Sequence, residues 1–553
     1  MFARLLQRTV MLAFTLATIS KSIAGQLNRE HSVRELENNE ANWPSLRFDF
    51  TLKRSSMRLY GQSTFSMVAN PVISNQGASV IYNTFATFTE GPMVYNYTYL
   101  DGSAFISKGC QNDNTVNHTV ECLGSESGNL PPINAIVEAI INATAVSENA
   151  DNIRCSTDHL FEVSIVGIKF SMCASGTGLK MYGTDMNIVV EYVRRPLDIS
   201  PFPKSVEACK TLVSPSSVTS TGKVLLAGEL TSSNTGRKLK AEFDFTFWSD
   251  GSDDESHSSS SDTHHNTENH GCSCKSTRRP CLFIHGMGID KEEPTNVDSF
   301  GYYWGNLTDH APCCSSIKYT VLNTINNSWM SDTQQQKVCD RALDVSGTSV
   351  NSTIRDTILV THSMGNLMLA GAIASQKCTL DSSSTWVGLA GPMKGSMGSD
   401  FVQASCAGET NGLLEQVADI TGKCPPTTAL VSLAYQGERF SSSKHDAAYT
   451  AAQKAYTANV YALMCSAGYS GLVSKYQAAF WALGATVPHK SGDNDGMVEF
   501  LSCAAGIPES QFGDTWRSRF YKTKLNHYDS EFLYGDGLLS EAKKPVKWFE
   551  CLL

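Results

Sequence analysis

The chain has 553 residues, of which 41% are hydrophobic and 18% are charged, and its formal net charge is -10. These figures exclude a disordered chain and a coiled coil, and the length allows two to four domains at roughly 100–200 residues each. The acidic balance, with no stripe of Lys and Arg, argues against nucleic acid as a partner. Seventeen cysteines are many for a cytosolic enzyme, and their odd number leaves one without an intrachain partner.

The first 24 residues have the three parts of a secretory signal peptide. Arg4 and Arg8 precede an apolar run from Val10 to Ile19, and small residues follow at Ser22-Ile23-Ala24. The run is too short to span a bilayer, which takes about 20 apolar residues. No other stretch is long enough, so we expect no transmembrane segment in the mature chain. We expect residues 1–24 to be removed and the chain to be secreted or held in the secretory-pathway lumen.

Six Asn-x-Ser/Thr sequons agree with a glycoprotein of that compartment, where disulfides persist. The candidate glycosylation sites are Asn96, Asn117, Asn142, Asn306, Asn326 and Asn351. Each triplet also arises by chance, so the argument for glycosylation rests on their combination with the signal peptide.

Before the polar stretch at 249–277, apolar and polar residues alternate. Runs at 46–50, 80–82, 161–165, 187–190 and 243–247 predict half-buried strands, and Gly and Asn between them favour antiparallel meanders. One helix is predicted, beginning after Pro131-Pro132 with apolar residues at helical spacing. We therefore expect residues 25–248 to form an antiparallel sheet with one helix, which either cups a lipid or packs as a sandwich. Its role is unknown.

A polar stretch occupies residues 249–277. From Ser249 to Ser276 it is almost wholly Ser, Asp, Glu, His, Thr, Asn and Gly, with no large apolar residue. Such a segment cannot bury enough surface to offset the entropy of ordering it, so it predicts a flexible linker. Its histidines, with Cys272 and Cys274, also allow a metal site. Their spacing matches no standard zinc pattern, so we expect disulfides and no metal.

The cysteines are divided unevenly along the chain. Five precede the linker and nine lie from Cys313 to Cys551, so each main half holds an odd number. This count predicts that Cys272 or Cys274 pairs with a cysteine in a flanking domain. Cys281, in a predicted core strand, is the expected leftover thiol.

After the linker, short apolar strands alternate with helices. Runs at 281–284, 358–360 and 386–389 suit buried parallel strands, and helix-compatible stretches separate them, so residues 278–553 predict an α/β sheet. From 400 to about 481 the chain is mostly helical in pattern, notably from His445 to Tyr469. We expect this stretch to be a helical cap inserted between core strands, followed by a strand near 485–487.

Thr361-His362-Ser363-Met364-Gly365 follows one of these strands and opens a helix. This is the strand–turn–helix setting of a nucleophile elbow, in which residues two before and two after the serine must be small. Gly365 satisfies the requirement, whereas Thr361 replaces the usual first glycine. The plain alternative is an ordinary serine at a helix N-terminus, so the argument depends on the partners of Ser363.

The first partner is His285-Gly286-Met287-Gly288, directly after the first strand of this half. The glycines Gly286, Gly288 and Gly365 let backbone N–H groups turn into a pocket. The amides of Met287 and Met364 could then hold the oxyanion of a tetrahedral intermediate. Alternatively, the segment is a glycine-rich turn with no chemical role.

The other partners supply an acid and a base. Asp495 lies in Asp493-Asn494-Asp495-Gly496-Met497-Val498, and His527 lies in Asn526-His527-Tyr528-Asp529. Ser363, Asp495 and His527 thus follow the order nucleophile, acid, base that an elbow fold requires. Asp493 is the alternative acid, and the Asp-Gly-Met-Val continuation favours Asp495.

With these motifs in view, residues 279–551 resemble the α/β-hydrolase superfamily on its lipase-like side. The segment 391–396 is similar to a Pro-His-x-Gly-Ser loop of many lipases, with Met393 in place of the histidine. Residues 494–498 resemble the segment that carries the acid in bacterial lipases, and 526–529 resemble their histidine segment. The N-terminal half shows no resemblance that we can name.

The resemblance implies a secreted serine ester hydrolase that cleaves lipid acyl esters through an acyl-enzyme, without a cofactor. Its partner is then an acyl ester or lipid, which a membrane or lipid surface could present. The sequence leaves the oligomeric state open. A GPI inositol deacylase or a palmitoyl-thioesterase-like enzyme shares these motifs. A different class is a non-catalytic lipid- or surface-binding protein that uses the β-rich half.

Overall fold

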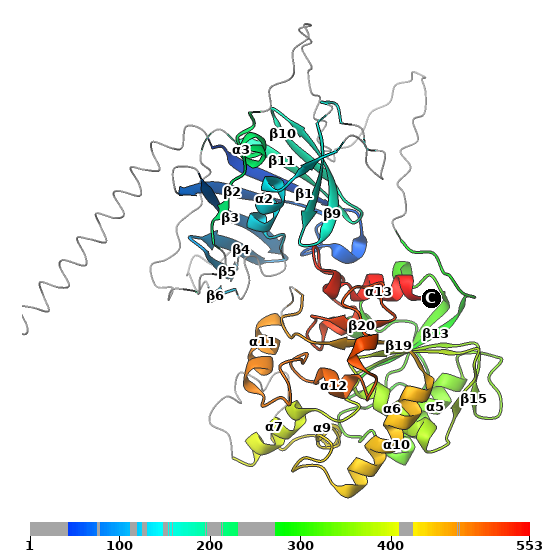
Figure 1. Cartoon of the computed structure of the whole chain (residues 1–553). Helices are drawn as coiled ribbons and strands as arrows, with labels where there is room; N and C mark the ends of the chain where they lie inside the picture. The colour runs from blue at the N-terminus through cyan, green and yellow to red at the C-terminus, as the bar shows by residue number, and fades with distance from the viewer. Residues whose placement is uncertain are drawn as a thin grey trace, which may run out of the picture.

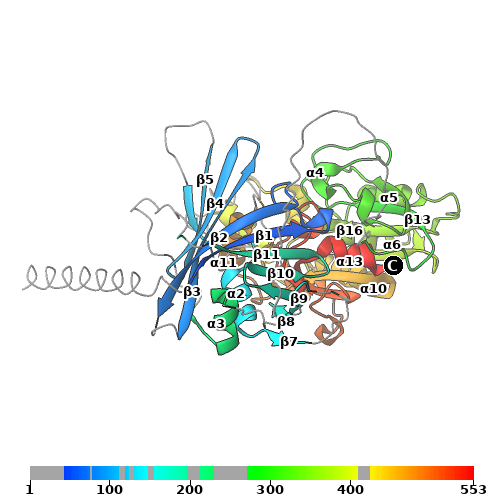
Figure 2. The ribbon, with the colours of Figure 1, turned by 90° about the horizontal axis from the view of Figure 1, so that it is seen from above.

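The computed structural model divides into an antiparallel and a parallel half, which lie side by side (Figures 1 and 2). The expected signal peptide, the strand at 243–247, Asn117 and most of the linker lie outside the residues that the structure describes. Those are residues 43–74, 78–110, 119–123, 130–146, 155–157, 159–193, 214–229, 271–408, 424–472 and 476–553, with single positions at 153, 195, 209, 212 and 474.

The described residues of the N-terminal half form one twelve-stranded sheet whose neighbouring strands all run antiparallel. Two meanders meet where β1 pairs with both β2 and β11, and the strands predicted at 46–50, 80–82, 161–165 and 187–190 are confirmed. The strands are β1 (Ser45–Leu52), β2 (Thr64–Ser74), β3 (Ser79–Glu90), β4 (Met93–Leu100), β5 (Ser103–Cys110), β6 (Thr119–Cys122), β7 (Thr144–Ala145), β8 (Leu160–Ile165), β9 (Ile168–Ser175), β10 (Gly178–Tyr182), β11 (Met186–Val193) and β12 (Ser216–Ser217).

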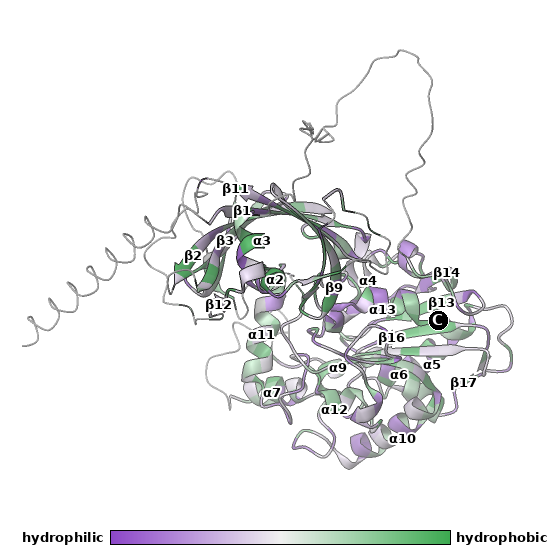
Figure 3. Cartoon of the chain, turned by 45° about the horizontal axis from the view of Figure 1, so that its top comes forward, coloured by the Kyte–Doolittle hydropathy of each residue, from purple (hydrophilic) through white to green (hydrophobic). Residues whose placement is uncertain are grey.

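This sheet curves around two helices, as Figure 3 shows. In β1, Leu46, Phe48 and Phe50 are buried while the residues between them are not, so one face of the strand forms core. The predicted helix is α2 (Ile133–Ile141), and its apolar residues share that core. The expectation of a single helix was incomplete, because α3 (Ser220–Ala227) lies beside α2.

The sequence does carry a signal for α3 at its two ends. The Thr219 side chain accepts a hydrogen bond from the Gly222 amide, and Gly228 ends the helix with φ 69°. Leu225 and Leu226 are its buried apolar residues in the core of this half. Since the helix has only eight residues, its apolar pattern alone is too short to predict it.

The C-terminal half holds a six-stranded parallel sheet with the strand order β14-β13-β16-β18-β19-β20. The strands predicted at 281–284, 358–360 and 386–389 are confirmed. The sheet comprises β13 (Arg279–Ile284), β14 (Cys314–Tyr319), β16 (Ile358–His362), β18 (Thr385–Leu389), β19 (Val460–Ser466) and β20 (Phe520–Thr523), and β15 (Thr353–Ile354) pairs separately with β17 (Thr379–Leu380).

Helices of this half flank the sheet in Figure 1. The described α-helices of this half are α4 (Gly301–Trp304), α5 (Asp332–Leu343), α6 (Met364–Ala374), α7 (Met397–Cys406), α9 (Thr428–Val431), α10 (Ser443–Asn459), α11 (Gln477–Thr486), α12 (Phe500–Cys503) and α13 (Pro545–Leu552). Within the described parts of the chain, no helix combines the length and the apolar character that crossing a bilayer requires.

The cap expected over about 400–481 is not one helical insertion. The helix α10 ends at Asn459 and the chain continues directly into β19, which lies inside the sheet between β18 and β20. Ala462, Leu463, Met464 and Cys465 are consecutive and all buried, so β19 lacks the alternation of a half-buried strand and the change from helix to strand leaves little trace in the sequence. The helix α10 packs beside α6, as a crossover helix does. The strand expected near 485–487 is also wrong, because α11 extends through Thr486.

Eight disulfides connect the cysteines, and the expectation for the linker cysteines is confirmed. Cys272 pairs with Cys551 and Cys274 with Cys313. The expectation for Cys281 is wrong, because the adjacent parallel strands β13 and β14 bring it beside Cys314. The free thiol is instead Cys110, exposed at the end of β5. The remaining pairs are Cys122–Cys209, Cys155–Cys173, Cys339–Cys378, Cys406–Cys424 and Cys465–Cys503.

This pairing predicts the outcome of thiol counting. In denaturant without reductant, one maleimide per chain is expected to react, and peptide mapping should locate it at Cys110. After reduction the count should rise to seventeen. A Cys110→Ser variant is the control and should take up no maleimide before reduction. A label on Cys281 in the unreduced protein would contradict the Cys281–Cys314 pair.

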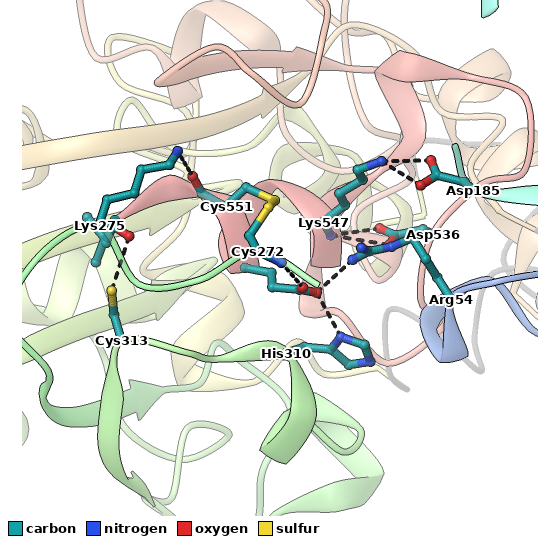
Figure 4. The surroundings of a disulfide bond; sticks show 11 residues. Arg54, Asp185, Cys272, Lys275, His310, Cys313, Asp536, Lys547 and Cys551 are labelled. Carbon is teal, nitrogen blue, oxygen red and sulfur yellow. Dashed lines mark hydrogen bonds and ion pairs between the residues drawn. A yellow bond between two sulfur atoms is a disulfide. The ribbon is translucent and has the colours of Figure 1, made fainter. Parts of the chain in front are cut away.

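The two halves are joined by a buried ionic junction around α13 (Figure 4). The Glu550 carboxylate accepts hydrogen bonds from Arg54 Nη2 at 2.6 Å, His310 Nδ1 at 2.9 Å and the Cys272 amide at 2.7 Å. Nearby, Asp185 pairs with Lys544 and Lys547, each at 2.6 Å. Burial raises the pKa of Asp185, but the two ammonium groups outweigh it and lower that pKa to about 2.

Apolar contacts reinforce this junction. Leu538 and Leu539 come from the C-terminal half, yet they belong to the hydrophobic core of the antiparallel half. Beside them Ser56 Oγ donates to Asp536 Oδ2 at 2.7 Å, and the Asp536 amide donates to the Ser56 carbonyl at 2.7 Å. The antiparallel half therefore packs on the segment that follows residues 526–529, where the candidate base lies.

Candidate active site

Ser363 lies at the turn between β16 and α6, in a strained backbone conformation. Its φ is 52° and its ψ is -128°, a region that residues other than glycine seldom adopt. Its amide donates to the Leu389 carbonyl at 2.9 Å, which anchors the turn to β18. This sharp turn from strand to helix is the geometry that lifts a serine hydroxyl above the end of a sheet.

Glycines permit the close packing around this turn. A Cβ on Gly365 would lie 2.7 Å from the carbonyl oxygens of Ile284 and His285, and one on Gly286 would lie 2.5 Å from Ser363 Cβ. Gly288 has φ 113° with open space around it. The His285–Gly288 turn therefore lies against Ser363 because neither Gly286, within the turn, nor Gly365, beside it, has a side chain. Met287 follows Gly286 in that turn, and Met364 opens α6, where the first amides have no intrahelical acceptor.

Asp495, His527 and Ser363 are joined by hydrogen bonds in one line. His527 Nε2 lies 2.9 Å from Ser363 Oγ, and His527 Nδ1 lies 2.7 Å from Asp495 Oδ2. All three residues are buried. The second carboxylate oxygen, Asp495 Oδ1, accepts the amides of Met497 at 2.9 Å and Val498 at 2.6 Å. Because the carboxylate is held on both sides, the imidazole is oriented with its Nδ1–H toward the acid.

The alternative acid, Asp493, and the carboxylate of Asp529 close to His527 in the sequence lie in different surroundings. Asp493 Oδ2 pairs with Lys522 Nζ at 3.1 Å, and its side chain is 48% exposed. Asp529 Oδ2 accepts the Leu472 amide, and burial raises its pKa to about 7. The structure thus brings Asp495 to His527, and it brings neither Asp493 nor Asp529 there.

Two further histidines lie near Ser363, and both belong to the scaffold. His285 donates from Nδ1 to its neighbouring Gly286 carbonyl at 2.8 Å and accepts the Leu322 amide at Nε2 at 3.0 Å. Burial lowers the pKa of His285 to about 4, so its ring is neutral. His362 is buried between the tyrosine Tyr303 and the His527 loop. Sequence reasoning did not identify Tyr303, because only the folded chain brings it to Gly286.

A hydroxyl bonded to an imidazole, which is itself bonded to a carboxylate, is the arrangement that turns serine into a nucleophile. The imidazole can take the proton from Ser363 Oγ while the carboxylate stabilises the imidazolium. Among the described residues, no group of three or more His, Cys, Asp or Glu side chains is placed to hold a metal ion.

The candidate glycosylation sites differ in exposure. Asn142, Asn306, Asn326 and Asn351 are exposed. Asn96 is partly buried in β4, where its Oδ1 accepts a hydrogen bond from Thr87 at 2.8 Å. The four exposed positions are therefore the better acceptors.

Comparison with known proteins adds little to this geometry. No family model matches the chain, and no curated protein matches it. Among solved structures, the lipase of Staphylococcus hyicus is similar at a TM-score of 0.25 and 13% sequence identity, over 50% of this chain and 94% of the lipase chain.

Proposed function

We propose that the chain is a serine hydrolase of the α/β-hydrolase class that cleaves carboxylic esters. The observation that carries this proposal is the line of hydrogen bonds from Ser363 Oγ through His527 to Asp495, at 2.9 Å and 2.7 Å. It is supported by the position of Ser363 on a strained turn between a parallel strand and a helix.

In the proposed mechanism, Ser363 Oγ attacks the ester carbonyl carbon while His527 takes the hydroxyl proton. The amides of Met287 and Met364 stabilise the oxyanion, and Asp495 stabilises the imidazolium. His527 then gives its proton to the leaving alcohol, and an acyl-enzyme remains. Water, activated by His527, attacks that acyl group and releases the acid, so no cofactor takes part.

We propose lipid acyl esters as the substrate class. Met287 and Tyr528 lie beside the site and pack on the hydrophobic core of the C-terminal half. The Tyr528 ring contacts Phe480 at 4.8 Å and Tyr476 at 4.9 Å between ring centroids. These surroundings suit an apolar acyl group better than a charged one. A thioester would react by the same steps, so the ester and thioester alternatives differ only in the leaving group.

We place this enzyme in the secretory pathway. The eight disulfides support that location, since such bonds persist in oxidising compartments. A domain of residues 25–248 and a hydrolase domain of residues 278–553 remain the proposed division, with the linker disulfides at the boundary.

Covalent labelling tests the proposal directly. A fluorophosphonate probe is expected to label the wild-type protein, with the adduct on Ser363, and Ser363→Ala should abolish the label. Ser375→Ala is the matched control, because Ser375 lies at the other end of α6 and should leave labelling unchanged. If the folded wild type stays unlabelled and hydrolyses no ester, the enzyme proposal fails and a binding protein becomes the better interpretation.

A further inference from the structure

Behind Ser363, four hydrogen bonds connect the turn at Gly286 with the loop of His527. The Gly286 amide donates to the Tyr303 hydroxyl at 2.8 Å, and that hydroxyl lies 2.6 Å from His362 Nδ1. On its other side, His362 Nε2 lies 3.1 Å from the His527 carbonyl oxygen and 3.0 Å from Ser530 Oγ. Tyr303, His362 and Ser530 are all buried.

The direction of these bonds follows from proton counting. The His527 carbonyl oxygen can only accept, so His362 Nε2 carries a proton and donates to it, with Ser530 Oγ as a second acceptor. With one ring proton on Nε2, His362 Nδ1 is an acceptor, so the Tyr303 hydroxyl, which accepts the Gly286 amide, donates its own proton to Nδ1. Ser530 Oγ donates in turn to the same carbonyl at 2.6 Å. These donors and acceptors together place the ring proton of His362 on Nε2, which fixes its tautomer.

Burial disfavours charge on the members of this chain of bonds. Burial, and then the neighbouring His527, lower the pKa of His362 well below its usual value. Burial and Glu531 raise the pKa of Tyr303 well above its usual value, and burial raises that of Glu531 as well. Glu531 Oε1 lies 3.8 Å from His362 Nδ1, and the burial of both groups opposes an ion pair between them.

We propose that Tyr303 is a positioning residue whose hydroxyl ties the Gly286–Met287 turn, through His362, to the backbone of His527. The proposal rests on the proposed function, because it concerns the relative placement of the oxyanion amides and the base. Gly286 and His527 lie on opposite sides of Ser363 in the chain and come from separate loops. A rigid connection between them maintains the geometry in which the serine is deprotonated and the oxyanion is held.

Tyr303→Phe tests this inference, because it removes one oxygen atom and keeps the ring. With a p-nitrophenyl ester, kcat is expected to fall about 10- to 100-fold, since small misplacements in a site have effects of that size. KM should change less than about twofold, and the rate of fluorophosphonate labelling should fall with kcat. Tyr302→Phe is the matched control: it is the neighbouring residue, 69% exposed, and its removal should leave both rates unchanged.

A double variant distinguishes a positioning role of Tyr303 from a general loss of stability. Ser530→Ala removes one acceptor of His362 and is expected to lower kcat about threefold. The double variant Tyr303→Phe/Ser530→Ala should lose less than the product of the single losses, because both act through His362. If Tyr303→Phe does not fold, the kcat of Ser530→Ala alone tests the inference. An unchanged kcat in Ser530→Ala would then overturn it.

Two results would contradict the role of Tyr303. One is a folded Tyr303→Phe variant with kcat within twofold of the wild type, and the other is multiplicative losses in the double variant. If the wild type itself shows no ester hydrolysis and no label, the proposed function has failed first. The two failures are thus distinguished by the wild-type measurement.

Discussion

Replacing Asp495 by asparagine is expected to lower kcat for ester hydrolysis by about 10⁴-fold, with little change in the fold. The reason lies in the two amides that Asp495 Oδ1 accepts, from Met497 and Val498. An asparagine must keep its carbonyl oxygen at that position, so its NH₂ group faces His527. The imidazole then accepts at Nδ1 and carries its proton on Nε2. In that tautomer it cannot take the proton of Ser363.

Asp493→Asn is the matched control, since it makes the same change two residues away. Asp493 is half exposed and its ionic partner is Lys522, so kcat should stay within about twofold and stability within about 1 kcal/mol. Initial rates with a p-nitrophenyl ester, together with circular dichroism of each variant, provide the measurement. A larger loss in Asp493→Asn than in Asp495→Asn would assign the acid to Asp493.

Local sequence carries the parts of this site that are continuous in the chain. Each of three segments combines an apolar run with small or charged residues. They are the His285–Gly288 turn, the residues from Thr361 to Gly365 and the segment around Asp495. The parallel strands β13 and β16 bring the first two of these segments to one edge of the sheet, whereas Asp495 follows α11 and is indicated by its motif and its order in the chain. The structure brings Ser363, Asp495 and His527 together accordingly.

What the sequence could not supply depends on tertiary contacts. Tyr303 reaches Gly286, and His362 reaches the His527 loop, across 17 and 165 positions of the chain. No spacing rule relates such residues. The strand β19 was missed for a different reason: Ala462, Leu463 and Met464 favour a helix by intrinsic propensity, and burial between two strands overrides it. Cys281 was misassigned because pairing depends on which strands are neighbours.

The junction between the halves should be sensitive to loss of one charge. Arg54→Ala is expected to lower the free energy of unfolding by about 3–5 kcal/mol, because it leaves the Glu550 carboxylate buried without its main cationic partner. The side chains of Arg54 and Glu550 are only 3% and 2% exposed. Arg517→Ala is the control, since it breaks the more exposed Arg517–Glu541 pair, at 2.8 Å, and should cost less than about 1 kcal/mol.

The pH dependence of this loss tests its electrostatic origin. Burial raises the pKa of Glu550, but the hydrogen bond from His310 and the charge of Arg54 outweigh it, so the folded-state pKa is lowered. A carboxylate with a lowered pKa stabilises the fold above its unfolded pKa, and this contribution is lost as pH falls through the folded value. The difference between wild type and Arg54→Ala in chemical unfolding should therefore be full at pH 7 and shrink in acid. A difference that stays constant down to acidic pH would attribute the loss to packing, and a loss below about 1 kcal/mol would show that the junction tolerates a lone carboxylate.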